Sequence, residues 1–161
     1  MKNLIFTLAM TLSVIGFGQT FTKKQVLWAY EPGGYLNKEI TMTSDERIGD
    51  SILLFTFRDM KYTHITSLGA AIFANPTECL KFFNGVKTLY SGVYDATNNT
   101  TMEFTDGGGT NIRVWRTRGM FGVKICVMYV GSAWCYLEEN KVDEILMTLN
   151  PDYFTPLTSN P

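Results

Sequence analysis

The densest basic and aromatic cluster of the chain, Arg113, Trp115, Arg116 and Arg118, has the chemistry to bind a ligand. On a strand, Arg113, Trp115 and Thr117 share one face. There the indole could stack on a sugar ring or a base, while the guanidinium binds a carboxylate or phosphate. In the alternative interpretation, arginine side chains cover the indole and pair with acids of a neighbouring strand. Arg113, Trp115 and Thr117 are therefore the candidate ligand-binding residues.

The single histidine of the chain, His64, limits the catalytic interpretations. On a strand, Tyr62, His64 and Thr66 share a face, and Asp59 or Asp50 could lie nearby in space. A histidine with a neighbouring carboxylate is the arrangement of a small hydrolase. The alternative is a surface or hydrogen-bonded histidine with a structural role. We assign no catalytic residue and keep the hydrolase as an alternative function.

Motifs for metal, phosphate and nucleophile chemistry are missing from the sequence. It has no CxxC or HxxxH pair with the spacing of metal ligands. The glycines at 107–109 lie between two predicted strands and are not followed by Lys-Ser or Lys-Thr, so they indicate a turn and not a phosphate loop. Neither GxSxG nor HExxH occurs. We expect no metal site and no cofactor.

The three cysteines are too few for a disulfide scaffold, and their odd number leaves at least one thiol without a partner in the chain. If residues 131–132 form a two-residue loop, Cys135 lies opposite Met128. Cys126 then lies opposite Leu137, so the two thiols are diagonal on one face, wider apart than a relaxed disulfide allows. Buried free thiols are the expected state.

The charge balance argues against a polyanion partner. Fourteen Lys and Arg against fifteen Asp and Glu give a formal net charge of −1. This balance disfavours binding driven by bulk positive charge, and nucleic acid is not the expected partner. Eleven Phe, eight Tyr and three Trp favour a folded, strand-rich domain.

The N-terminal residues 1–18 have the pattern of an export signal. Lys2 precedes an apolar run at 4–17, and Gly16 and Gly18 supply the small residues that a signal peptidase requires. The run is too short to span a membrane comfortably. We expect a secreted or periplasmic protein without a membrane span after cleavage, with one domain at 19–150 and an irregular tail at 151–161.

Strands must position the candidate residues. Alternating apolar residues and turn-forming segments predict two groups of strands. The first group is expected at 25–30, 39–43, 51–59 and 62–73, where Gly69 marks a bulge, and the second at 101–105, 111–117, 121–130 and 133–138. Because both faces of 121–130 are apolar, this strand is expected to be central.

A helix is predicted after each group of strands. Asn75 as N-cap, Pro76 at the first position and Glu78 three residues after the cap predict a helix over 76–90 that ends at Gly92. A second helix is expected over 141–149, capped by Asn140. The predicted fold is α+β, with a largely antiparallel sheet of about seven or eight strands and two helices.

The order of four strands and a helix, twice over, resembles the architecture of the Whirly and PUR families of single-stranded nucleic-acid binders. The resemblance covers most of residues 25–150, and a diverged duplication is one interpretation of the repeated order, although the two halves do not align in sequence. The lysine-glycine motif of the Whirly family has no counterpart in this sequence, so no residue is assigned from it. The resemblance makes single-stranded nucleic acid an alternative ligand.

Together these features predict a small exported protein without catalytic activity, acting as a binding or structural module outside the cytoplasm. A protein or a glycan is the expected kind of partner. The hydrolase based on His64 and the nucleic-acid binder are the alternatives.

Overall fold

The computed structural model describes residues 23–34, 36–44, 51–61, 67–92, 100–118 and 122–150. The signal predicted at 1–18, the tail predicted at 151–161 and His64 lie outside these ranges. Within them, no helix has both the length and the apolar character needed to cross a membrane.

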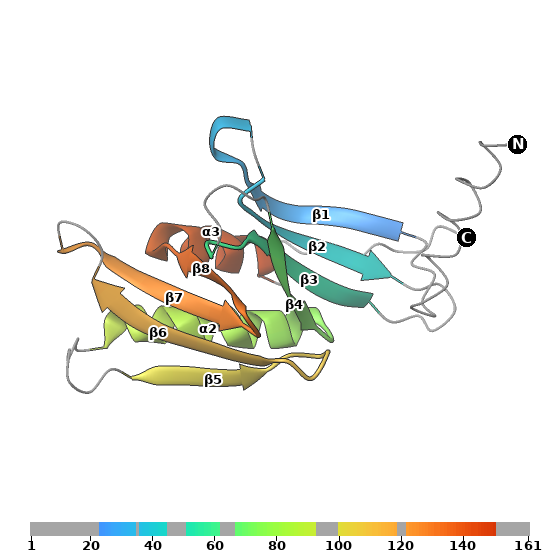
Figure 1. Ribbon diagram of the computed structural model, residues 1–161. Helices are drawn as coiled ribbons and strands as arrows, with labels where there is room; N and C mark the ends of the chain where they lie inside the picture. Colours follow the sequence, from blue (N-terminus) through green and yellow to red (C-terminus); the bar gives the residue numbers. More distant parts are fainter. Residues whose placement is uncertain are drawn as a thin grey trace, which may run out of the picture.

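Eight antiparallel strands form two sheets, ordered β1-β2-β3-β4 and β5-β6-β7-β8 (Figure 1). The first sheet contains β1 (Lys23–Tyr30), β2 (Lys38–Ser44), β3 (Ser51–Arg58) and β4 (Leu68–Phe73), with the short helix η1 (Pro32–Gly34) after β1. The second contains β5 (Thr101–Thr105), β6 (Asn111–Arg118), β7 (Lys124–Val130) and β8 (Ala133–Leu137). Helix α2 (Pro76–Ser91) follows the first sheet, and α3 (Glu139–Leu149) follows the second.

The predicted α+β class, with antiparallel strands and two helices, is confirmed. The strands are divided between two sheets instead of forming one. The strand predicted at 121–130 begins at Lys124, and as β7 it occupies an inner position between β6 and β8.

A cluster of phenylalanine rings joins the two sheets through α2. Phe83 of α2 meets Phe55 of β3 edge to face, with ring centroids 5.4 Å apart. Phe82 lies 5.3 Å from Phe73 of β4 and 5.5 Å from Phe104 of β5. Each sheet thus turns one face, the inner face, towards the helices, and α2 lies along the inner face of the second sheet (Figure 1).

The start of α2 follows the predicted capping pattern. Asn75 Oδ1 accepts a hydrogen bond from the Glu78 amide at 2.9 Å. Glu78 Oε2 accepts from the Ala74 amide at 3.0 Å, one residue before the cap amide that the pattern predicts. The apolar stripe of the helix is buried, and its buried members are Cys79, Phe82, Phe83, Val86 and Tyr90.

The start of α3 corrects the prediction. The helix begins at Glu139, and its cap position is Glu138, which makes no capping bond with its side chain. Asn140, the predicted cap, therefore lies inside the first turn. The Glu138 carboxylate instead accepts a hydrogen bond from Lys38 Nζ at 3.0 Å. A contact with the other sheet takes the place of a local cap.

The strand predicted at 62–73 begins at Leu68, and 62–66 lie outside the described residues. The bulge predicted at Gly69 is wrong, because Gly69 pairs with Phe57 in a continuous register. A Cβ at position 69 would overlap the Phe57 ring. The glycine therefore makes room for an aromatic ring.

The hairpin of β7 and β8 has the predicted register. Cys126 lies opposite Leu137, and Met128 lies opposite Cys135. The three cysteines are buried and free. Burial raises the pKa of the Cys126 thiol to about 11 and also raises the pKa of Cys79 and Cys135. These thiols are protonated at neutral pH and thus poor nucleophiles.

The loop between β5 and β6 closes the edge of β4 through the buried Asp106. Its Oδ1 accepts hydrogen bonds from the amides of Gly108 and Thr110, at 3.0 and 2.7 Å. Its Oδ2 accepts from the Ile72 amide at 3.0 Å, and the Gly107 amide donates to the Ile72 carbonyl at 2.7 Å. One carboxylate thus orders its own loop and joins that loop to the other sheet.

The segment after β3 closes the edge of β8 in the same way. Asp59 Oδ1 accepts hydrogen bonds from the Lys61 amide at 3.0 Å and from the Trp134 amide at 3.1 Å. The Met60 amide donates to the Trp134 carbonyl at 2.9 Å. The last strand of each sheet therefore has part of its edge covered by a loop of the other sheet, which satisfies backbone groups that would otherwise remain open for pairing.

Replacing Asp106 with asparagine tests this junction. An amide oxygen in place of Oδ1 preserves the loop bonds, while the amide nitrogen meets the Ile72 N–H without an acceptor. We expect Asp106→Asn to lower the free energy of unfolding by about 1–3 kcal/mol in urea melts. Glu103→Gln, on exposed β5, serves as control and should change stability by less than about 0.5 kcal/mol. Equal stability of the two variants would show that the Ile72 bond contributes nothing.

Candidate functional site

The register of β6 divides the predicted basic and aromatic cluster between two faces. Arg113, Trp115 and Thr117 lie on the outer face of the second sheet, as the alternation predicts. Arg116 lies on the inner face and is 4% exposed. It is therefore removed from the surface on which Arg113 and Trp115 lie.

Arg116 has a structural role at the end of α2. Its Nη1 donates to the carbonyl oxygens of Tyr90 at 3.0 Å and Gly92 at 2.7 Å. These carbonyls belong to the last turn and cap of the helix, where a cation also interacts favourably with the helix dipole. The guanidinium thus joins β6 to α2.

A row of three aromatic rings crosses the outer face of the second sheet. Trp115 of β6 stacks on Tyr129 of β7, with centroids 5.2 Å apart and planes at 16°. Tyr129 in turn stacks with Trp134 of β8 at 6.1 Å and 16°. We call Trp115, Tyr129 and Trp134 the aromatic row. Tyr136 adjoins it, edge to face with Trp134 at 5.2 Å.

Strand pairing explains the row. Tyr129 and Trp134 are direct partners across β7 and β8. Trp115 pairs with Val127 and thus lies diagonal to Tyr129, within reach of an aromatic side chain. Pairs of this kind contribute about 0.5–1.5 kcal/mol each beyond area burial.

A hollow of about 580 Å³ lies beside the aromatic row. Ile125 and Val127 of β7 lie between the flanking side chains of β6 and β8, so they form its floor. The hollow is within the size range of small-molecule sites. Its described lining residues are Trp115, Thr117, Arg118, Ile125, Val127, Tyr129, Trp134 and Tyr136.

Two of the three predicted site residues, Trp115 and Thr117, line this hollow. Arg113 does not line it. Arg113 is exposed and lies in register between Glu103 of β5 and Tyr129 of β7.

Sequence analysis missed the other aromatic residues of the surface. Tyr129 comes from β7, which was predicted to be a central strand with two apolar faces, and Trp134 and Tyr136 come from β8, for whose faces no prediction was made. Alternation with the buried Met128 and Cys135 was the signal that could have placed them on the outer face.

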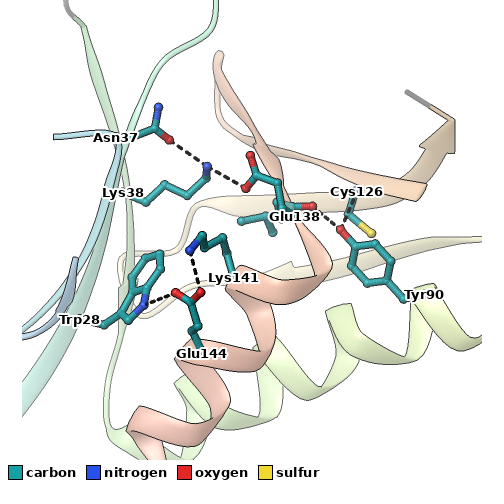
Figure 2. Close-up of polar contacts among 9 residues, drawn as sticks. Trp28, Asn37, Lys38, Tyr90, Cys126, Glu138, Lys141 and Glu144 are labelled. Carbon is teal, nitrogen blue, oxygen red and sulfur yellow. Dashed lines mark hydrogen bonds and ion pairs between the residues drawn. The ribbon is translucent and has the colours of Figure 1, made fainter. Parts of the chain in front are cut away.

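Aromatic side chains on the outer face of the second sheet differ from those in the interior in their hydrogen bonding. Among the described residues, no hydrogen bond is made by the side-chain polar groups of Trp115, Tyr129, Trp134 or Tyr136. By contrast, the polar side-chain groups of the buried residues Trp28 and Tyr90 have hydrogen-bond partners (Figure 2). The Trp28 indole donates to Glu144 at 3.3 Å, and the Tyr90 hydroxyl donates to the Leu137 carbonyl.

The charged residues between the first sheet and α3 are paired (Figure 2). Lys38 is 2% exposed and donates to Asn37 and Glu138, at 2.8 and 3.0 Å. Lys141 donates to Glu144 at 2.6 Å, and this bond, with that from Trp28, lowers the pKa of the Glu144 carboxyl. These groups stabilise the packing of α3 and leave no site for a ligand among them.

The described residues do not provide the arrangement of a histidine and a carboxylate that the hydrolase alternative requires. His64 and Asp50 lie outside them, and Asp59 is engaged by backbone amides. Within the described ranges no group of three His, Cys, Asp or Glu side chains is placed to hold a metal ion.

Comparison of the chain with family models, with curated proteins and with solved structures gives no match. The resemblance to the Whirly and PUR families stays a prediction from the element order. The function must therefore be inferred from the surface itself.

The two faces of β6 can be compared with one pair of substitutions. Arg116→Gln removes buried bonds to the end of α2 and should lower the free energy of unfolding by about 1–3 kcal/mol. Arg113→Gln, on the exposed face, should change it by less than about 0.5 kcal/mol. Urea melts of both variants check this. Equal effects would show that the assignment of inner and outer faces is wrong.

Proposed function

We propose that this protein is a non-catalytic binding module that acts outside the cytoplasm and binds its ligand on the outer face of β6, β7 and β8. The observation that carries the proposal is the aromatic row beside a hollow of about 580 Å³. Exposed apolar surface rimmed by polar groups is typical of interaction sites.

The aromatic row is separate from the hydrophobic core. The core lies between the inner faces of the sheets, where residues such as Phe55, Phe83, Ile112 and Met128 are completely buried. The ring polar groups of the row have no partner among the described residues, so they are available to a ligand. This combination of apolar surface and free donors is what a binding surface requires.

The export signal predicted at 1–18 supports the proposed location. It is the basis for placing the ligand in the periplasm or outside the cell. The surface itself does not depend on this location.

Single-stranded nucleic acid is a second candidate ligand. The observed order of four strands and a helix, repeated once, is the order on which the resemblance to nucleic-acid binders is based. Arg113 is a basic residue on the same face of β6 as the partly buried indole of Trp115. The formal net charge of −1 argues against this candidate, because affinity for a phosphate backbone depends on positive charge.

Removing Trp115 tests the proposed surface. We expect Trp115→Ala to weaken binding at least tenfold, because it removes the first ring of the row, and to cost about 1–3 kcal/mol of stability, because the partly buried ring loses both stacking and buried area. Tryptophan fluorescence titration measures binding against a panel of aryl acids, neutral oligosaccharides and oligodeoxythymidine. Urea melts measure stability.

Met147→Ala provides a control for this experiment, since Met147 is exposed on α3 and belongs to the other side of the second sheet. Its binding should equal that of the wild type. The proposal fails if no panel compound binds in a manner that depends on Trp115, or if Trp115→Ala unfolds the protein.

The location can be tested by mass. Protein recovered from outside the cytoplasm of a native-like host should begin near Gln19, because Gly16 and Gly18 fit the sites that precede signal cleavage. Intact-mass measurement decides this. Extracytoplasmic protein that retains Met1 would contradict cleavage.

A further inference from the structure

We infer that the hollow beside the aromatic row takes a small, uncharged aromatic molecule that carries a hydrogen-bond acceptor, such as an aryl ketone. This inference rests on the proposed function and names the ligand class of the same surface. The ring system lies over Ile125 and Val127, and its acceptor is within reach of the hydroxyl groups of Thr117 and Tyr136.

The floor of the hollow suits an apolar ring. Val127 is 8% exposed and Ile125 is partly buried, and both are aliphatic, so neither can bind the hydroxyl groups of a sugar. Trp115 and Tyr136 are the direct partners of Val127 on the two neighbouring strands, and Thr117 is the partner of Ile125 on β6. A volume of about 580 Å³ fits a ligand of a few fused rings.

The stacking within the aromatic row favours an aromatic ligand over a sugar, a nucleobase or a cation. Both faces of the Tyr129 ring are taken, one by Trp115 and the other by Trp134, with planes at 16° in each pair. A pyranose, a base or a cation binds on a free ring face, which the centre of the row does not offer. It offers a ring edge, whose positive partial charge attracts the π face of an aromatic ligand.

The hollow has no free charge for an ionic ligand. Of its described lining residues, Arg118 is charged and none is acidic. Arg118 follows the buried Arg116 by two residues on β6, so strand alternation directs it to the inner face, and it already takes part in another interaction. An ionic group bound here loses its hydration without gaining a counter-charge, which costs free energy. The lining therefore favours an uncharged ligand.

Hydrogen-bond donors around the hollow are accessible. Among the described residues, the buried side-chain polar atoms that lack a hydrogen bond are Gln25 Oε1 and Thr41 Oγ1, both in the first sheet. The hydroxyl groups of Thr117 and Tyr136 also have no partner within the described ranges, but they are not among these buried atoms, so they reach solvent. Both can donate a hydrogen bond, and the indole nitrogen of Trp115 can only donate. A ligand oxygen that accepts, such as a carbonyl, is the complement of this set.

Three compounds with one ring system test the inference: the ketone 2-acetonaphthone, the acid 2-naphthoate and the hydrocarbon 2-ethylnaphthalene. Their affinities for the folded wild-type protein at pH 7 are measured by displacement of a neutral fluorescent naphthyl ketone, 6-propionyl-2-(dimethylamino)naphthalene, whose emission shifts to the blue in apolar surroundings. The ketone should bind at one site and at least tenfold tighter than the ionised acid, which finds no free cation. It should also bind at least as tightly as the hydrocarbon, which is more hydrophobic but has no acceptor.

Variants of the lining separate hydrogen bonding from shape. Trp115→Ala should weaken both the ketone and the hydrocarbon. The double variant Thr117→Val and Tyr136→Phe removes two hydroxyl groups with little change of shape. It should weaken the ketone by about threefold to tenfold, the size of one lost hydrogen bond, and change the affinity for the hydrocarbon less than twofold. Arg113→Gln, on the same strand but outside the hollow, should change every affinity less than twofold.

Adding these compounds to the panel for the proposed function lets the two proposals fail separately. Naphthoate that binds as tightly as the ketone overturns the uncharged ligand. A ketone that binds more weakly than the hydrocarbon, or whose binding is unaffected by the double variant, overturns the acceptor. Trp115-dependent binding of an oligosaccharide or oligodeoxythymidine without ketone binding overturns the ligand class. Each of these results leaves the surface standing. If nothing binds in a Trp115-dependent manner, both the inference and the proposed function fall.

Discussion

The structure depends on a reciprocal junction in which an aspartate from each sheet closes the last strand of the other. Asp106 accepts from the Ile72 amide on β4, and Asp59 accepts from the Trp134 amide on β8. Without these loops, two edge strands would expose backbone donors and acceptors to pairing with other chains. The two junctions join the sheets at two separate edges, and α2 fills the space between the sheets with its phenylalanine rings.

That arrangement decides which surfaces are free. α2 and α3 cover the inner faces, and no helix within the described ranges covers the outer face of the second sheet. Strand alternation then sends every second side chain of β6, β7 and β8 to that face. Asp59 also links the junction to the candidate site, since the residue whose backbone it holds, Trp134, ends the aromatic row. Rigid support of this kind favours a preorganised binding surface.

The polar groups also differ between the interior and the outer face of the second sheet. Lys38, Arg116 and Tyr90 lie in the interior and have hydrogen-bond partners that join elements distant in sequence. Buried polar groups are tolerated only when they are paired in this way. The aromatic row, which lines the hollow, has polar atoms without such partners among the described residues. The contrast is the physical basis for regarding the outer face as functional and the interior polar network as structural.

The sequence alone determined the features that depend on residues close together in the chain. The capping of α2 by Asn75, the order of strands and helices, and the diagonal placement of Cys126 and Cys135 follow from local turns, caps and periodicity. Only the tertiary structure decided the division into two sheets, the inward position of Arg116, the space that Gly69 leaves for Phe57, and the row that unites Trp115 with two strands further along. Each of these features depends on which distant strand lies alongside. That choice is set by the packing of the inner faces and the pairing of the strand edges. Neither can be predicted from the local pattern of residues.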